Sequence, residues 1–292
     1  MALLKRSKPE GKADPEGRMP LMEHLRELRN RLVIGMLGVT AGTVVGFVFF
    51  DTLWQFVSSP YCNLPFAQSL KAGTCFQVRA VFEAFFVNLK VAIVFGMVVS
   101  APLWLYQIWA FVTPGLYRNE RRYTSIFLAI GVPLFAAGTA LAYFVLDKGL
   151  ALLFSFAPDN ATPFMEMTSY IDYALLMFIV FGVSFELPLL LVLLNVIGVL
   201  KRATVAKHRR MIIFAMFVFG AIATPGSDPI AMIALSIPLV IFFALAELFM
   251  YWRESRLPKT EDYSHLSDDE ASELSDDDPR DRETSGPSAS GR

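Results

Sequence analysis

The chain has 292 residues, of which 54% are hydrophobic and only 18% are charged, and its formal net charge is −1. This composition excludes an ordinary soluble domain, in which about a quarter of the residues are charged, and a disordered chain, which is poor in apolar residues. No basic excess points to nucleic acid as a partner.

The net charge is a sum over two unequal regions. Residues 253–292 hold 12 acidic and 6 basic side chains, whereas the preceding part holds 15 acidic and 20 basic ones. We predict that residues 1–18 and 253–292 are disordered tails, because neither can bury enough apolar surface to become ordered. The acidic tail is interpreted as a solubilising terminus, with an interaction segment as the alternative.

Residues 19–31 form a different kind of segment. Leucines recur there at helical spacing, at Leu21, Leu25, Leu28 and Leu32, with polar side chains between them. The pattern predicts an amphipathic helix at the cytoplasmic interface that continues into the first span. A plain membrane anchor is the alternative interpretation.

Six nearly uncharged stretches follow in residues 32–252. They cover residues 32–50, 84–112, 123–146, 173–200, 211–227 and 229–246. A spanning helix needs about 20 mostly apolar residues, so the first four qualify and the last two are marginal. We predict an all-α polytopic integral membrane protein with six transmembrane helices, of which the fifth and sixth are short. Five spans with a re-entrant last pair is the alternative.

The basic residues set the orientation of these spans. Twenty-two Lys and Arg residues fall on the side that carries both termini, and only Lys71, Arg79 and Lys148 fall on the other. The positive-inside rule therefore places both termini in the cytoplasm. Lys90 lies within the second span.

Cys62 and Cys75 both lie in the first outer loop, where the compartment permits disulfides. A disulfide between them would stabilise the fold by roughly 3 kcal/mol on the chain-entropy argument. Two free thiols are the alternative.

Two carboxylates lie at unusual positions. Glu120 stands among three arginines in the first cytoplasmic loop, where it either pairs locally or receives a guanidinium from a partner. Glu186 lies in the middle of the fourth span, two residues before Pro188, so it faces protein or water or is protonated. It is either part of a transport path or a structural hydrogen-bonding group. Gln107 is a further polar residue within a span.

The sequence offers no catalytic machinery. Its three histidines lie apart, and it has no metal-ligand spacing, no phosphate-binding glycine loop and no nucleophile elbow. We therefore predict neither an enzyme nor a bound cofactor or metal. A secondary transporter or channel for a small solute is the competing class, against which no inverted repeat is visible.

Seven segments, in order along the chain, resemble the TatC family, the receptor and core subunit of the twin-arginine protein translocase. They are EHLRELRNRL (23–32), SSP (58–60), APLWLYQIWAF (101–111), PGLY (114–117), ERR (120–122), FGVSFELP (181–188) and ATP (223–225). The resemblance covers roughly residues 20–250. It implies export of folded proteins with Arg-Arg signal peptides, driven by the protonmotive force, in the bacterial cytoplasmic membrane. Single-span TatA and TatB subunits are the implied partners, in a complex with several copies.

The resemblance also implies roles for individual residues. Glu120, Glu27 and Arg29 would form the signal-binding patch, with Phe111 beside it. Pro60 would shape the outer cap, Glu186 would face the concave membrane side, and Asp228 would lie in the outer turn. Thr224 and Met232 would belong to the edge where partner helices dock. The chain departs from the family at Met232, where a polar amide is expected, and its turn is one residue longer.

Overall fold

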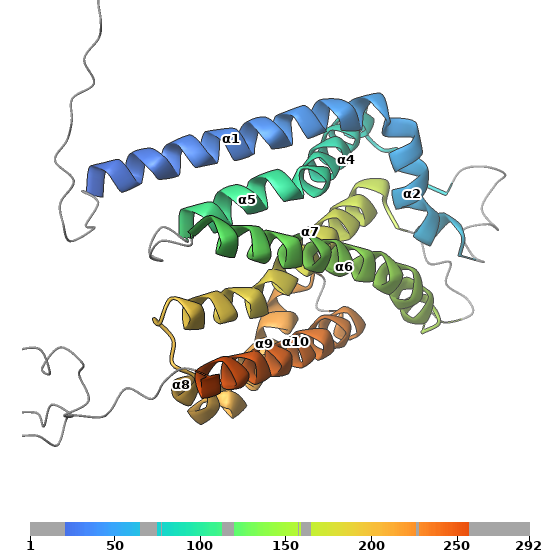
Figure 1. Cartoon of the computed structure of the whole chain (residues 1–292). Coiled ribbons are helices and arrows are strands. Elements are labelled where there is room, and N and C mark those ends of the chain that lie inside the picture. The colour runs from blue at the N-terminus through green and yellow to red at the C-terminus, as the bar shows by residue number, and fades with distance from the viewer. Residues whose placement is uncertain are drawn as a thin grey trace, which may run out of the picture. The chain divides into compact units, whose positions relative to one another are not determined.

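A computed structural model describes residues 21–64, 75–76, 78–112, 120–156, 158, 165–225 and 228–256. The chain divides into two units, Met1–Glu254 and Ser255–Arg292, and the helix packing below belongs to the first. All regular structure in the described residues is helical (Figure 1). The helices are α1 (Leu21–Val48), α2 (Phe50–Cys62), α4 (Glu83–Val99), α5 (Ala101–Val112), α6 (Glu120–Phe154), α7 (Met167–Val196), α8 (Arg202–Lys207), α9 (Arg209–Ala223) and α10 (Pro229–Arg256).

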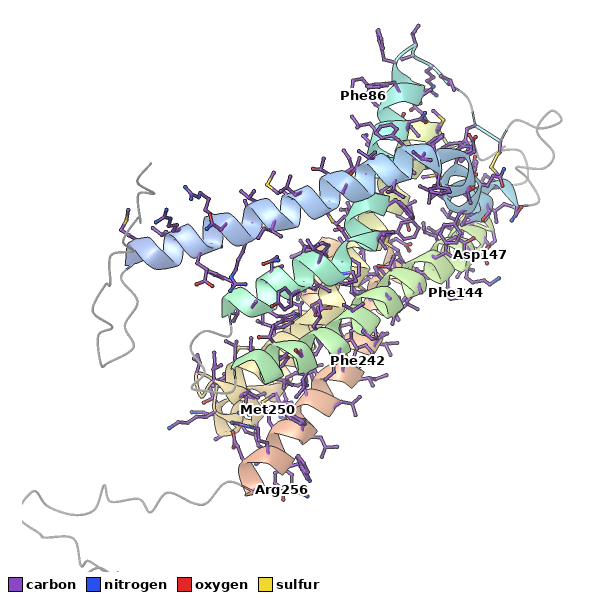
Figure 2. All side chains as sticks on the ribbon, turned by 45° about the horizontal axis from the view of Figure 1, so that its top comes forward. Phe86, Phe144, Asp147, Phe242, Met250 and Arg256 are labelled. Carbon is purple, nitrogen blue, oxygen red and sulfur yellow. A yellow bond between two sulfur atoms is a disulfide. The ribbon has the colours of Figure 1, made fainter. Side chains whose placement is uncertain are left out.

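Four of these helices are long and apolar enough to cross a membrane by themselves. They include the stretches Leu25–Val48, Thr124–Phe154, Met167–Val196 and Pro229–Arg256. Large apolar side chains cover the outside of the bundle, as at Phe86 of α4 and Phe144 of α6, which are 54% and 62% exposed (Figure 2). An apolar exterior on long helices is suited to lipid rather than water.

Residues 21–48, which include most of the predicted amphipathic segment and of the first predicted span, form one continuous helix, α1. Leu25, Leu28 and Leu32 of the leucine stripe are exposed, and Leu25 and Leu32 are more than half accessible. The stripe therefore forms no part of the core of the described bundle.

The second predicted span is bent. Residues 84–112 divide into α4 and α5, which meet at Ser100 at an angle of 58°. Pro102 has no backbone N–H and is best accommodated in the first turn of a helix, which favours a new helix starting there. The indole of Trp104 donates a hydrogen bond of 2.8 Å to the Met97 carbonyl, which the bend leaves at the end of α4.

The prediction of a short sixth helix is wrong. The fifth, α9, has 15 residues, but α10 has 28 and continues through residues 253–256, which the sequence assigned to the tail. The predicted sixth span ended before Glu247, because the uncharged stretch ends at this charged residue. In the structure the carboxylate of Glu247 lies 3.9 Å from the guanidinium of Arg209, and Glu254 accepts hydrogen bonds, so the helix carries these charges.

Glycines allow two pairs of helices to pack backbone to backbone. A Cβ atom on Gly42 of α1 would lie 2.7 Å from the Gly96 carbonyl oxygen of α4, and one on Gly138 of α6 would lie 2.5 Å from the Phe181 oxygen of α7. Both separations are shorter than a van der Waals contact, so larger residues would separate the helices. α7 is the most buried of the four spans and packs against both α4 and α6.

Candidate functional site

The N-terminal part of α1 carries two of the predicted signal-binding residues. The carboxylate of Glu27 accepts two hydrogen bonds from Arg31, one of them 2.9 Å long, and both side chains are about one-quarter exposed. Arg29 points to solvent and donates to the side chain of Asn30 at 3.2 Å. The local salt bridge therefore involves Glu27 and leaves Arg29 accessible.

A groove of about 650 Å³ lies between α1, α5 and α7. Its walls are apolar apart from a few groups, which include Arg31 of α1 and Gln107 of α5, and Phe111 lines it near the end of α5. The tertiary structure thus brings Gln107 and Phe111 to one surface with Arg31, which pairs with Glu27. Val183 of α7 forms part of the same wall.

Glu120 is the first residue of α6, and its side chain lies outside the described residues, as does the preceding stretch 113–119. A carboxylate in the first turn of a helix is favoured by the helix dipole. α5 and α6 pack together and are joined by seven residues, so the start of α6 lies at the Phe111 end of α5.

Glu186 is turned into the bundle. Both of its carboxylate oxygens are buried, and they accept no hydrogen bond from any described residue. They lie against Gly131 of α6 and near the indole nitrogen of Trp109 of α5. The carboxyl group is therefore covered by α5 and α6. The position of Glu186 on the concave membrane face stays a prediction.

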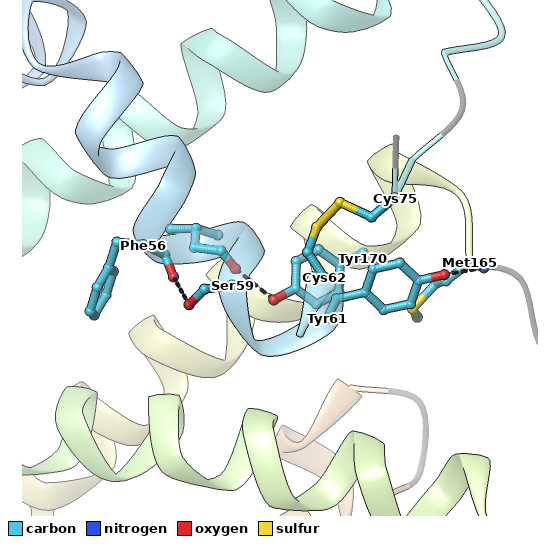
Figure 3. Close-up of a disulfide and its surroundings, with 8 residues drawn as sticks. Phe56, Ser59, Tyr61, Cys62, Cys75, Met165 and Tyr170 are labelled. Carbon is cyan, nitrogen blue, oxygen red and sulfur yellow. Dashed lines mark hydrogen bonds between the residues drawn. A yellow bond between two sulfur atoms is a disulfide. The ribbon is translucent and has the colours of Figure 1, made fainter. Parts of the chain in front are cut away.

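The cap built from α2 and the segments that it packs on is held together by a disulfide and by aromatic rings. Cys62 and Cys75 form a disulfide with a Cα–Cα distance of 5.4 Å (Figure 3). The buried Tyr61 stacks on Phe76 with ring centroids 4.8 Å apart, and its hydroxyl accepts a hydrogen bond of 3.0 Å from the backbone N–H of Met165. Tyr170 of α7 donates at 2.6 Å to the Val57 carbonyl of α2.

Pro60 lies buried inside α2, where it cannot donate to the carbonyl of Phe56. The hydroxyl of Ser59 donates to that carbonyl instead, at 3.1 Å, and forms a second hydrogen bond of 2.8 Å with the hydroxyl of Tyr143 on α6. Pro60 thus leaves the Phe56 carbonyl without a backbone donor, and Figure 3 shows the hydrogen bond that Ser59 donates to this carbonyl instead.

Three predicted residues meet where α9 turns into α10. Asp228 is buried, accepts the backbone N–H of Ile230 at 2.8 Å at the start of α10, and accepts the hydroxyl of Tyr173 at 2.8 Å. Thr224 is also buried and donates to the Gly220 carbonyl at 2.8 Å. Met232 is half-buried on α10. Asp228 and Thr224 therefore have partners inside the chain.

Comparisons with known proteins identify the family and the fold of this chain. The family model described as Sec-independent protein translocase protein (TatC) matches residues 23–238. The chain belongs to the TatC family. It is 39% identical over 272 residues to TatC of Frankia casuarinae, covering 90% of this chain and 75% of that protein. It is 34% identical over 285 residues to TatC of Corynebacterium kroppenstedtii, covering 90% and 69%.

A crystal structure of the twin-arginine translocase receptor TatC in the detergent DDM has the same fold, with a TM-score of 0.65 and 30% identity over 77% of this chain and 98% of that one. A second TatC receptor structure gives a TM-score of 0.63 and 28% identity. This TatC chain is therefore a membrane-embedded subunit of the Sec-independent protein translocase. Its described residues hold no cluster of side chains suited to a metal ion.

Polar contacts at the end of α7 in this TatC protein were not predicted from the sequence. Glu254 accepts hydrogen bonds from the side chain of Asn195 at 2.8 Å and from the backbone N–H of Arg202 at 3.0 Å. Arg253 donates to the last carbonyls of α7, including that of Val196 at 3.2 Å. Such long-range pairs have no local sequence pattern, because their partners lie more than 50 residues apart.

Proposed function

We propose that this TatC subunit recognises Arg-Arg signal peptides and, with TatA- and TatB-like single-span partners, exports folded proteins using the protonmotive force. The observation that supports this most directly is the apolar groove with Arg31, Gln107 and Phe111 on its walls. A signal of this kind joins two guanidinium groups to an apolar segment. The subunit offers the Glu27 carboxylate, paired with the groove residue Arg31, beside an apolar groove.

The proposed topology has six spans with both termini in the cytoplasm of a bacterium and several copies in one complex. The bent pair α4–α5 would be the second span and α9 the fifth. With 15 residues α9 is about 22 Å long, which is less than the hydrocarbon core of about 30 Å. The bilayer would therefore be thinner beside α9. Residues 1–18 and 257–292 would be solvated tails.

The proposed recognition uses carboxylates that can change partner. The Glu27–Arg31 pair is partly exposed, and pairs of this kind contribute less than about 1 kcal/mol. A signal guanidinium can therefore replace Arg31. Glu120 would bind the second guanidinium at the start of α6. Carboxylates bind arginine in a bidentate way that lysine cannot reproduce, which explains a preference for an Arg-Arg pair.

We also propose that partner helices dock along the α9–α10 edge. Ile222 and Ile233 there are 80% and 46% exposed, next to the half-buried Met232. Since Thr224 and Asp228 are buried, their contribution would be to hold the edge in shape.

The test is export of a folded reporter with an Arg-Arg signal. Glu120→Gln, which keeps the size of the side chain but removes its charge, should abolish export while the protein still inserts at normal abundance. Asp51→Asn, an exposed acid on α2, is the matched control and should export normally. Normal export by a Glu120→Gln and Glu27→Gln double variant would rule out the carboxylate site.

A further inference from the structure

The recess that receives the Glu186 carboxyl group is created by a missing side chain on α6. A Cβ atom on Gly131 would lie 3.0 Å from Oε2 and 3.3 Å from Oε1 of Glu186, and 3.3 Å from Nε1 of Trp109. These separations are tighter than most contacts of a real Cβ atom. A residue larger than glycine at position 131 therefore presses on the carboxyl group, which has to shift by at least a few tenths of an ångström.

Shape, and not hydrogen bonding, holds the carboxyl group in this recess. Its oxygens are buried and accept no hydrogen bond from the described residues. Trp109, which closes one side, is itself fixed by a stacked contact with Phe127, with ring centroids 5.4 Å apart. A buried polar group without a hydrogen bond is costly, so little resists its movement once the recess is filled.

An open surface lies close to the recess on the same helix. Val183 and Leu187, three residues before and one residue after Glu186, are 44% and 37% exposed. Val183 also lines the groove between α1, α5 and α7. A change of side-chain rotamer at Glu186 can thus carry the carboxyl group from the recess toward this apolar face.

We propose that Gly131 is a positioning residue that keeps the Glu186 carboxyl group withdrawn between α5 and α6, so that the face of α7 beside the groove stays apolar. This inference rests on the proposed function, because that face would receive the apolar segment of the signal peptide. Gly131 acts through Glu186 and does not touch the signal.

The first test is Gly131→Ala in the full-length protein in native membranes. Labelling of Glu186 by dicyclohexylcarbodiimide, measured by mass spectrometry, should rise several-fold, and export of the Arg-Arg reporter should fall about tenfold. Gly149→Ala is the matched control on the same helix, because its nearest neighbour, an oxygen of Asp228, would lie 3.8 Å away. The control should leave labelling and export unchanged.

The second test separates positioning from simple helix packing. Glu186→Asp shortens the side chain by one methylene, so Gly131→Ala combined with Glu186→Asp should export within twofold of Glu186→Asp alone. An equal loss of export by Gly131→Ala in both backgrounds would mean that the alanine only separates the helices. Unchanged Glu186 labelling in Gly131→Ala at normal abundance would overturn the proposal.

Failure of the Gly131 proposal can be distinguished from failure of the proposed signal recognition. Increased labelling with normal export would disprove the link between the carboxyl group and the groove, whatever Glu120→Gln does. Loss of export in Glu120→Gln without any effect of Gly131→Ala would leave the signal site standing and remove only the positioning role.

Discussion

The cap around α2 and the groove between α1, α5 and α7 are built on opposite principles. In the cap a disulfide, stacked rings and hydrogen bonds between distant segments bind α2 to α6 and α7. In the groove apolar walls stand open, and the charged pair Glu27–Arg31 lies within one turn of a single helix. The difference indicates that the cap stabilises the bundle, whereas the groove is available for binding.

The largest effect on stability is expected at the centre of the cap. Tyr61→Ala removes a fully buried ring and should lower the free energy of unfolding by about 3–5 kcal/mol. Thermal unfolding of the purified protein in detergent would measure this as a lower Tm. Phe156→Ala, which removes an exposed ring, is the control. Equal Tm values for the two variants would mean that the cap is not a stabilising unit.

The disulfide should have the next largest effect. Replacing Cys62 and Cys75 by serine opens a loop of 13 residues and should cost about 3 kcal/mol by the chain-entropy argument. Tm measured with and without reductant checks this, because reductant should lower the Tm of the unmodified protein to that of the variant. A Tm insensitive to reductant would contradict it.

A single hydrogen bond of the cap should matter less. Tyr170→Phe leaves the ring but removes the donor to the Val57 carbonyl, which should cost about 1–2 kcal/mol because the acceptor stays buried. Tyr251→Phe, on an exposed side chain of α10, provides the comparison. A loss as large as that of Tyr61→Ala would show that this hydrogen bond, and not the rings, holds α2 to α7.

The smallest effect on stability is expected in the groove, where a substitution should instead weaken the binding of a signal peptide. Leu32→Ala truncates a side chain that is 56% exposed and lines the groove, so Tm should change little. Binding of a synthetic Arg-Arg signal peptide to the protein in detergent should weaken several-fold, because apolar contact is lost. If Tm falls while peptide binding is unchanged, the contrast between cap and groove is wrong.

Local sequence patterns predicted much of the scaffold. The uncharged stretches located α1, α6 and α7, and the turn residues separated α9 from α10. The same patterns missed α2, because residues 50–62 were taken as part of a loop although Phe50, Leu53 and Val57 recur there at helical spacing. They overlooked the bend at Ser100. They also ended α10 too early, because the partners of Glu247 and Glu254 lie elsewhere in the chain.

The residues of the candidate site could be named from the sequence, but their arrangement could not. Gln107 and Phe111 were assigned to different roles, yet they line one groove because they lie four residues apart on one helix. The burial of Thr224 and Asp228 and the cap residues Tyr61 and Tyr170 were not foreseen, because side-chain burial depends on neighbours contributed by other helices.

The sequence by itself determined that this chain is helical and apolar, and that its basic residues gather in the segments at one predicted end of the helices. Hydrophobicity and charge can be read from the residues themselves, without any tertiary contact. Only the tertiary structure decided which polar groups are satisfied and which are hidden. Gly131 shows the reason: the position of the Glu186 carboxyl group depends on an absent side chain 55 residues earlier, which no local pattern can reveal.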